Sequence, residues 1–151
     1  MLVGIISDIH GYLSQDIADE LSDVDMILCA GDIERPSILF ELQAIAPTIA
    51  VYGNCDHYDY ALCSGSLASP RIGGVRFRMV HRPEDIGSVP EDVSVVVHGH
   101  THIPRHDVLG DVHYINPGSA TRPRGSSNKS IAKVTIDQGC VKSVDFYTWD
   151  A

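Results

Sequence analysis

Short apolar runs alternate with amphipathic segments along the first third of the chain. The runs at residues 2–7, 25–30 and 48–52 end at polar or glycine residues, which is typical of buried strands. Between them, residues 13–22 and the segment that opens at Pro36 carry apolar side chains at helical spacing. This order of strand, helix, strand, helix, strand predicts parallel strands joined by right-handed crossovers.

The remainder of the chain predicts strands with few helices between them. The loop expected at residues 121–130 is rich in Arg, Pro, Gly and Ser. The expected strands cover residues 75–81, 93–98, 112–115, 131–136 and 141–147. The sequence shows no internal repeat and no domain linker, so residues 1–151 are predicted to form a single α/β domain. In this domain two sheets would pack face to face, with helices outside.

Composition and charge narrow the class of protein. The 151 residues carry a net charge of −9, and 44% of them are apolar, as in an ordinary globular domain. The acidic excess argues against a dedicated nucleic-acid surface. The first 70 residues hold 11 acidic residues and one basic residue, whereas the other 81 hold 9 and 10. These acids form a solvated face, chiefly beside the first helix, or include metal ligands, and composition alone does not decide between the two.

The expected location is cytoplasmic. Residues 1–7 lack the basic and long apolar regions of a signal peptide, and no apolar stretch reaches the roughly 18 residues of a membrane helix. The four cysteines form no CxxC pair, which makes a disulfide framework improbable. We therefore expect no membrane partner.

Polar side chains follow five of the predicted strands, at the point where each strand ends. Carboxyl ends of strands in an α/β sheet are where ligands bind. Carboxylate, imidazole and amide ligands suit Zn²⁺, Mn²⁺ or Fe²⁺, and seven are too many for one ion but fit two ions about 3.5–4 Å apart that share a carboxylate. The seven are Asp8, His10, Asp32, Asn54, His81, His100 and His102.

The order of these motifs, D-x-H, G-D, G-N-x-D, H and G-H-x-H, resembles the calcineurin-like metallophosphoesterases. The form Gly53-Asn54-Cys55-Asp56 and the segment at residues 115–119, Ile-Asn-Pro-Gly-Ser, are most similar to the small YfcE-like phosphodiesterases, whose fold the retromer subunit Vps29 shares. The resemblance implies a four-layer α-β-β-α sandwich of two mixed sheets flanked by helices.

The resemblance also implies a role for each ligand. Asp8, His10 and His102 would hold the first metal, Asn54, His81 and His100 would hold the second, and Asp32 would bridge the two. A hydroxide that bridges the ions would then attack a small phosphate ester. Mn²⁺ is the ion we expect, with Zn²⁺, Fe²⁺, Ni²⁺ and Mg²⁺ as alternatives. A different outcome is a non-catalytic interaction module like Vps29, with a vestigial metal site.

Two segments depart from the wider family pattern: Cys55, and His81-Arg82-Pro83, which stands where the family commonly has His-Gly-His. Cys55 stands where many members have a histidine that protonates the leaving group, and a thiol is a poor general acid. Cys55 is then a weak acid or a packing residue, and we expect a preference for good leaving groups such as aryl phosphodiesters. Asp56 either orients a ligand or is a turn residue. The predicted catalytic set is Asp32, Asn54, Cys55 and Asp56.

Other polar residues near the motifs have weaker expectations. Arg82, Ser119 and Arg122, with Arg124 nearby, are candidates for contact with substrate phosphate, although Ser119 fits equally well as a residue that steadies the loops. His98 is expected to pack beside the site, and His57, His106 and His113 are expected to be ordinary surface or strand residues. Homo-oligomer formation is left open.

Overall fold

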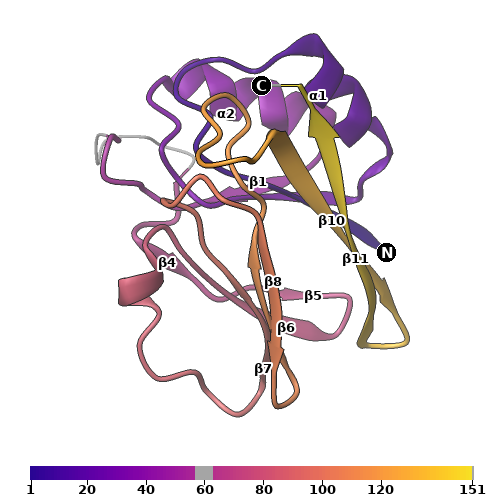
Figure 1. The fold of residues 1–151 in the computed structure, drawn as a ribbon. Helices are drawn as coiled ribbons and strands as arrows, with labels where there is room; N and C mark the ends of the chain where they lie inside the picture. The colour runs from indigo at the N-terminus through magenta and orange to yellow at the C-terminus, as the bar shows by residue number, and fades with distance from the viewer. Residues whose placement is uncertain (57–62, 151) are drawn as a thin grey trace.

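Five strands form the first of two sheets in the computed structural model, which describes residues 1–56 and 63–150 (Figure 1). They are β1 (Leu2–Ile6), β2 (Met26–Cys29), β3 (Thr48–Ala50), β10 (Lys129–Asp137) and β11 (Cys140–Trp149), in the order β11-β10-β1-β2-β3. The pairs β1–β2 and β2–β3 are parallel, as predicted, whereas β10 pairs antiparallel with β1 and β11. The sheet is therefore mixed.

The second sheet contains the remaining strands, in the order β4-β6-β7-β9-β8 with β5 paired to β6. They are β4 (Leu67–Ala68), β5 (Arg71–Ile72), β6 (Val75–Val80), β7 (Val93–Val97), β8 (Arg105–Leu109) and β9 (Val112–Asn116). Parallel pairs join β6 to β7 and β7 to β9, and the other pairs are antiparallel. The sequence predicted β6, β7 and β9, but not β4, β5 or β8. The first two have only two residues each, and β8 is largely exposed and lacks an apolar alternation.

The main core lies between the two sheets. Val3 and Ile5 of β1 face Val95 and Val97 of β7 across it, and all four are fully buried. Ile6 belongs to a second core on the opposite face of the first sheet, under the helices. Because both faces are covered, β1 is a continuous apolar run rather than an alternating one. Each buried Val or Ile side chain stabilises the fold by about 1.5–3 kcal/mol.

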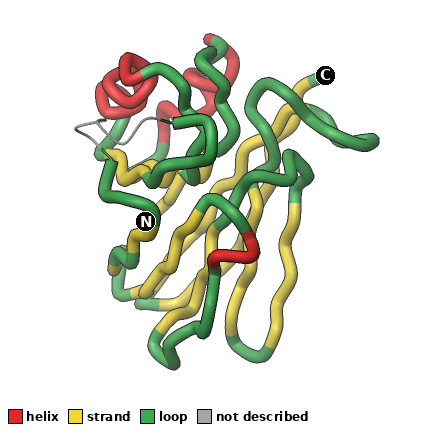
Figure 2. The backbone as a smooth tube through the Cα atoms, turned by 90° about the vertical axis from the view of Figure 1, so that its left-hand side faces the viewer, coloured by secondary structure: helices red, strands yellow, loops and turns green. Residues whose placement is uncertain are grey.

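The helices α1 (Gln15–Glu20) and α2 (Pro36–Ile45) cover the outer face of the first sheet, followed after α1 by the short 3₁₀ helix η1 (Leu21–Asp23) (Figure 2). The Ser14 hydroxyl accepts a hydrogen bond from the Ile17 amide at 3.3 Å and so caps α1. Pro36 occupies the first turn of α2, where its missing N–H costs nothing.

The outer face of the second sheet is covered by the β6–β7 crossover. Arg78 points away from the core that Phe77 and Met79 enter, and its Nε donates to the Ile86 carbonyl at 2.8 Å. Within the described residues this layer contains only the 3₁₀ helix η2 (Pro83–Asp85). The predicted α/β fold of two mixed sheets is confirmed, while the expected helix layer on this side is reduced to one short turn and a loop.

Some of the acids near the first helix do more than face solvent. Lys133 of β10 is 2% exposed, and its Nζ lies 2.8 Å from both Glu20 Oε2 and Asp23 Oδ1. Nζ also lies 4.6 Å from the centre of the Tyr147 ring. These contacts tie α1 and η1 to the sheet, so the expected acidic surface is in part a set of ion-pair partners.

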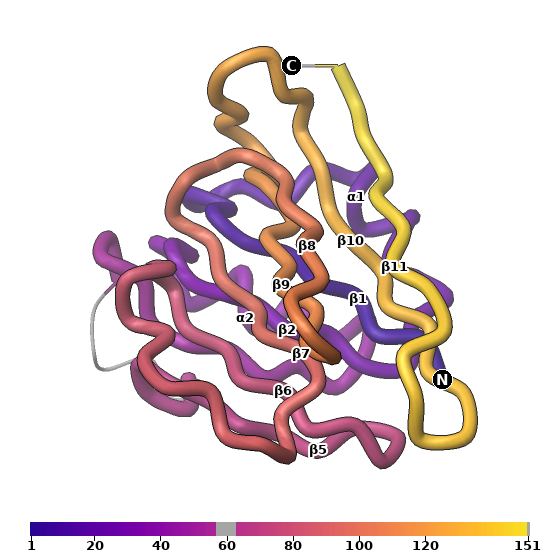
Figure 3. The backbone as a smooth tube through the Cα atoms, turned by 60° about the horizontal axis from the view of Figure 1, so that its bottom comes forward, coloured from indigo at the N-terminus to yellow at the C-terminus, as the bar shows by residue number. Residues whose placement is uncertain are grey.

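The amino terminus is held by the first sheet. The amino-terminal amine donates to the Ile136 carbonyl at 2.9 Å, beside the β10–β11 hairpin (Figure 3). Among the described residues, no helix is both long and apolar enough to cross a membrane.

Candidate metal centre

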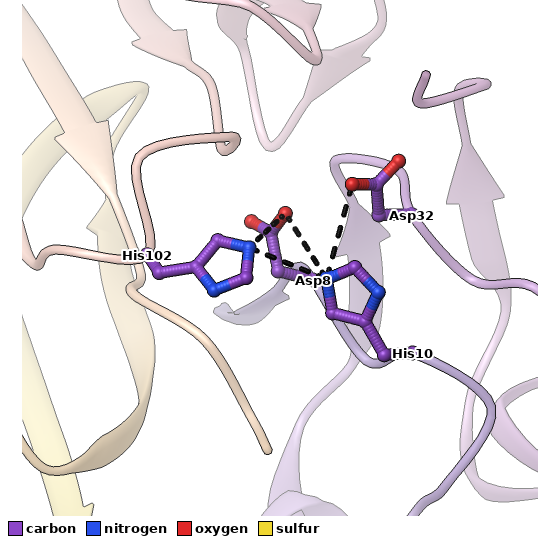
Figure 4. A group of neighbouring side chains, drawn as sticks. All are labelled: Asp8, His10, Asp32 and His102. Atoms are coloured by element: carbon purple, nitrogen blue, oxygen red, sulfur yellow. Dashed lines mark hydrogen bonds and ion pairs between the residues drawn. The ribbon is translucent and has the colours of Figure 1, made fainter. Parts of the chain in front are cut away.

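Four acidic and histidine side chains converge just past the carboxyl ends of β1, β2 and β7 (Figure 4). Asp8 Oδ1 lies 3.2 Å from His102 Nε2, which in turn lies 3.2 Å from His10 Nε2. His10 Nε2 lies 3.9 Å from Asp32 Oδ2. One ligand atom from each of the four lies within 4.8 Å of the others, close enough to share an ion.

The other predicted ligands adjoin this group on the Asp32 side. His81 Nε2 lies 3.3 Å from Asp32 Oδ2, and the His81 ring meets the His100 ring edge-on, with centroids 5.3 Å apart. His100 Nδ1 lies 3.1 Å from Asn54 Oδ1. The structure thus links all seven predicted ligands in one chain of direct contacts.

Hydrogen bonds to the backbone set the tautomer of two of these histidines. His81 Nδ1 faces the Ala30 carbonyl at 2.7 Å, and His102 Nδ1 faces the Arg122 carbonyl. A carbonyl only accepts, so Nδ1 carries the proton in both rings. The lone pair of Nε2 is then free and points at the cluster, which is the arrangement that a metal ligand requires.

Three buried polar atoms of the cluster residues lack a hydrogen-bond partner among the described residues: Asp8 Oδ1, His81 Nε2 and, on the outer side of its ring, His10 Nδ1. Asp8 Oδ2, by contrast, accepts from the Ser7 hydroxyl at 2.9 Å and from the His100 amide at 3.0 Å. An unsatisfied buried polar group costs about 1–3 kcal/mol. A cation bound between Asp8 Oδ1 and His81 Nε2 would remove that cost for both atoms, so the residues present fit a metal ion.

The charge state of the cluster also suits a cation. Burial raises the pKa of Asp32, but its close contact with His81 and the hydrogen bond from the Cys55 amide outweigh it and hold the pKa at about 2. Burial lowers the pKa of His81, and its contact with Asp32 together with the charge of Asp8 more than offsets this, so the net pKa is raised. Asp32 is therefore an anion at neutral pH.

Backbone strain is concentrated at this site. Of the seven non-glycine residues with positive φ in the described part of the chain, six belong to these loops, and the seventh is Gln138 in the β10–β11 turn. Such conformations cost of order 1 kcal/mol or more each and cluster at functional sites. The six are Asp8 (51°), His10 (49°), Asp32 (54°), Glu34 (68°), His100 (75°) and His102 (62°).

Close approaches of the loops explain the glycines of the motifs. A Cβ on Gly53 would lie 2.1 Å from Asp32 Oδ1, and one on Gly99 would lie 2.1 Å from Ser7 Oγ and 2.7 Å from Asp8 Oδ2. These contacts are too short for any side chain. The G-N and G-H motifs are therefore required for the ligand loops to pack against the two carboxylates.

Asp56 holds two loops together and does not face the cluster. Its Oδ1 accepts from the amides of Ile33 and Glu34, and its Oδ2 accepts from the Gly53 amide, all at 2.8 Å. Of the two interpretations that the sequence left open, the structure favours a positioning role. We no longer place Asp56 among the residues that contact the reacting atoms.

Ser119 is likewise a structural anchor. It is fully buried, and its hydroxyl donates to the Asp8 carbonyl at 2.8 Å while accepting from the Arg122 amide at 2.8 Å. A side chain used in this way does not reach a substrate, so the structure supports the loop-steadying alternative over the predicted phosphate contact. Asn116 acts similarly, since its Nδ2 donates to Gly99 O at 3.2 Å and to Thr101 Oγ1 at 2.9 Å.

Two cavities open beside the cluster. The first, about 350 Å³, is lined by cluster residues together with Cys55, Arg122 and Arg124. The second, about 270 Å³, is lined by Asn54, His81 and Arg82 among others. All three arginines are exposed at these openings, where an anion entering the site would meet them.

Partial burial and the charges of Asp32 and Glu34 raise the pKa of the Cys55 thiol, so it is protonated at neutral pH.

Of the other histidines in the described residues, His98 packs beside the ligand loops, and His106 and His113 lie on strands of the second sheet, as expected. His98 is buried, with Nδ1 3.0 Å from Gly99 O and Nε2 3.1 Å from Arg105 Nη1. His106 and His113 stack on β8 and β9, with ring centroids 5.2 Å apart. His57 lies outside the described residues.

Sequence reasoning missed two side chains that support the site. Ser7 binds Asp8, and Glu34 lies 3.3 Å from His10. The sequence does show a hydroxyl residue next to Asp8 and a carboxylate two residues after Asp32. Neither spacing, however, indicates that the side chain contacts a ligand.

Two sheets with histidines and aspartates gathered at one edge are the arrangement that the motifs predict for the metallophosphoesterase class. Residues 1–139 match the family described as the calcineurin-like phosphoesterase superfamily domain. The chain belongs to this family, and the identification made from its motifs is confirmed.

Named relatives agree with this assignment. The chain is 33% identical over 155 residues to a probable metallophosphoesterase of Methanocaldococcus jannaschii, covering 91% of this chain and 77% of that protein. It is 31% identical over 98 residues to the phosphodiesterase YfcE of Escherichia coli strain K12, covering 59% of this chain and 53% of YfcE.

Solved structures share the fold. An archaeal phosphodiesterase superposes with a TM-score of 0.78 at 22% identity, covering 99% of this chain and 100% of that one. Vps29 of Entamoeba histolytica, in complex with Zn²⁺, superposes with a TM-score of 0.69 at 23% identity, covering 98% and 99%. At these identities the likeness shows the fold alone.

Proposed function

We propose that the protein is a phosphodiesterase that uses two divalent metal ions to hydrolyse small phosphate esters. The observation that carries this proposal is the cluster itself: seven predicted ligand side chains linked in one chain of contacts, with Asp8 Oδ1 and His81 Nε2 buried and unsatisfied. A domain that had kept only the fold would have no reason to retain these uncompensated atoms.

The residues divide into two sets around Asp32. Asp8, His10 and His102 would hold one ion, and Asn54, His81 and His100 would hold the other, with the ionised Asp32 carboxylate shared between them. When bound, the two ions would stabilise charge on the phosphoryl oxygens and lower the pKa of a water, which makes a nucleophile available near neutral pH.

The chain itself orients the ligands and attracts the substrate. Ser7 and the His100 amide fix one oxygen of Asp8 and leave the other free for a cation. The Arg122 carbonyl holds His102 in the required tautomer, while the Arg122 side chain lies at the cavity mouth. An anionic ester therefore meets positive charge on its way into an otherwise acidic site.

The leaving group is the point at which the proposal is most specific. Cys55 is the titratable side chain at the cavity that could donate a proton, and its raised pKa makes it a weak acid. We expect bis(4-nitrophenyl) phosphate to be cleaved with a kcat/KM at least about 10²-fold higher than a dialkyl phosphate, because effective general acids contribute about 10²–10⁴-fold and the Cys55 thiol is a weak one. A chromogenic assay of 4-nitrophenolate for the aryl ester and phosphorus NMR of the alkyl monophosphate product for the alkyl ester, both with added Mn²⁺, measure the ratio.

Equal rates for the two esters would contradict the proposal that the site has only a weak general acid for protonating the leaving group. A protein that binds metal but turns over neither diester nor monoester would instead support the alternative, a non-catalytic interaction module of the Vps29 kind. The Asp111→Asn variant, altered in the exposed β8–β9 turn, serves as the control and should match the wild type.

Several finer points are part of the same proposal. Mn²⁺ is the ion we favour, because the mixed nitrogen and oxygen ligands suit it. Cytoplasmic location, the absence of a nucleic-acid or membrane partner, and the open question of homo-oligomer formation stay as predicted from the sequence.

A further inference from the structure

His10 differs from His102 and His81 in how its outer nitrogen is held. His102 and His81 each direct Nδ1 at a backbone carbonyl. His10 Nδ1 is buried and has no aligned hydrogen-bond partner among the described residues. The group that faces it is a carboxylate, since Glu34 Oε1 lies 3.3 Å away.

The carboxylate is positioned to complete this contact. The Glu34 side chain is 33% exposed and the His10 side chain is 5% exposed, so a small rotation of the outer partner aligns the pair while the imidazole stays fixed. An ionised carboxylate only accepts hydrogen bonds, and it would therefore keep the proton on Nδ1 and leave Nε2 free.

The backbone that carries Glu34 is fixed to the backbone that carries His10. The His10 amide donates to Asp32 O at 2.9 Å, and the Gly11 amide donates to Ile33 O at 2.9 Å. The Glu34 amide is held by Asp56, and Glu34 adopts a strained φ of 68°. Strain of this kind persists only where the surroundings impose it.

We infer that Glu34 is a positioning residue that sets the tautomer and ring orientation of His10 and thereby tunes the affinity of the first metal ion. This inference rests on the proposed function, in which His10 Nε2 is a ligand. Glu34 acts through His10 and has no contact with substrate in this account.

A second arrangement would use His10 and Glu34 together with Cys55. One ligand atom each from His10, Glu34 and Cys55 also lies within a common 4.8 Å, so the three could hold an ion of their own. The geometry favours positioning, because His10 Nε2 already points at the Asp8 and His102 cluster.

The first test is made on the full chain stripped of metal. Nitrogen NMR of the His10 ring should show the Nδ1–H tautomer in the wild type and a shift toward Nε2–H in Glu34→Ala, with Glu34→Gln in between because its amide oxygen still accepts. Glu41→Ala, at an exposed position of α2, is the matched control and should leave the His10 signals unchanged.

The second test is the affinity for Mn²⁺, measured by titration. Glu34→Ala should weaken binding of one equivalent by about 10–100-fold, the usual effect of removing a partner of a metal-bound histidine, while kcat at saturating Mn²⁺ changes much less. An unchanged tautomer together with unchanged affinity would overturn the inference.

Two outcomes separate this inference from the alternatives. If the wild type binds no metal, the proposed function fails, but the tautomer measurement still decides the role of Glu34. If Co²⁺ produces a thiolate-to-cobalt absorption band that disappears in Cys55→Ser, then Glu34 and His10 Nδ1 serve as ligands of a further ion, and the positioning role is wrong.

Discussion

Replacing Asp32 with asparagine should lower kcat at saturating Mn²⁺ by about 10²–10³-fold or more, the scale on which removal of a preorganised electrostatic group acts. The carboxylate lies between His81 and His10, and its pKa of about 2 keeps it charged at neutral pH. The amide keeps the shape but has no charge and only one oxygen, so it cannot be shared between two ions. Steady-state kinetics over a range of Mn²⁺ concentrations measure the loss.

Asp111→Asn is the matched control, because it removes one carboxylate from an exposed turn. Circular dichroism should show that both variants keep the wild-type fold. Full activity of Asp32→Asn with saturating Mn²⁺ would show that the carboxylate does not bridge the ions.

The second large effect is expected from His81→Ala. From the sequence this ligand was the least secure, because His81-Arg82-Pro83 stands where the family commonly has His-Gly-His. In the structure its Nε2 is buried, unsatisfied and 3.3 Å from Asp32, and its Nδ1 is locked by the Ala30 carbonyl. We expect the variant to lose one of two bound ions and at least about 10²-fold in kcat.

Measured metal content and activity together check this expectation. His106→Ala, an exposed imidazole on β8, is the control for loss of a histidine and should retain both. Unchanged metal content and activity in His81→Ala would remove His81 from the ligand set.

The ligand loops could be located from sequence because their signals are local. Each motif follows a short apolar run, and strand ends of an α/β sheet meet at one edge, so the sequence predicts that Asp8, Asp32 and His100 lie together. The glycines in the motifs also have a direct physical cause, since a Cβ at Gly53 or Gly99 would collide with a neighbouring side chain.

Roles that depend on where a side chain points could not be predicted in the same way. Asp56 and Ser119 lie in the expected loops, but only the structure shows that both bind backbone amides. The sequence does not predict the contact between Glu34 and His10, because it depends on the positive φ of Glu34, which no residue pattern encodes. The edge strand β8 and the reduced outer layer likewise carry no apolar periodicity.

The uneven charge of the chain also acquires a structural explanation. Asp8 and Asp32 belong to the metal centre, while Glu20 and Asp23 pair with the buried Lys133. The arginines of the second half reach the same edge of the sandwich, where Arg82, Arg122 and Arg124 border the two cavities. Opposite charges are thus brought together at the site by the fold.

The central claim is that this chain holds two divalent ions around Asp32. The most direct measurement is the number of ions bound per chain, determined by equilibrium dialysis of the chelator-treated protein against Mn²⁺ followed by elemental analysis. The account predicts two ions per wild-type chain and fewer in Asp32→Asn. A wild-type value of zero or one, under conditions in which the enzyme is saturated, would contradict it.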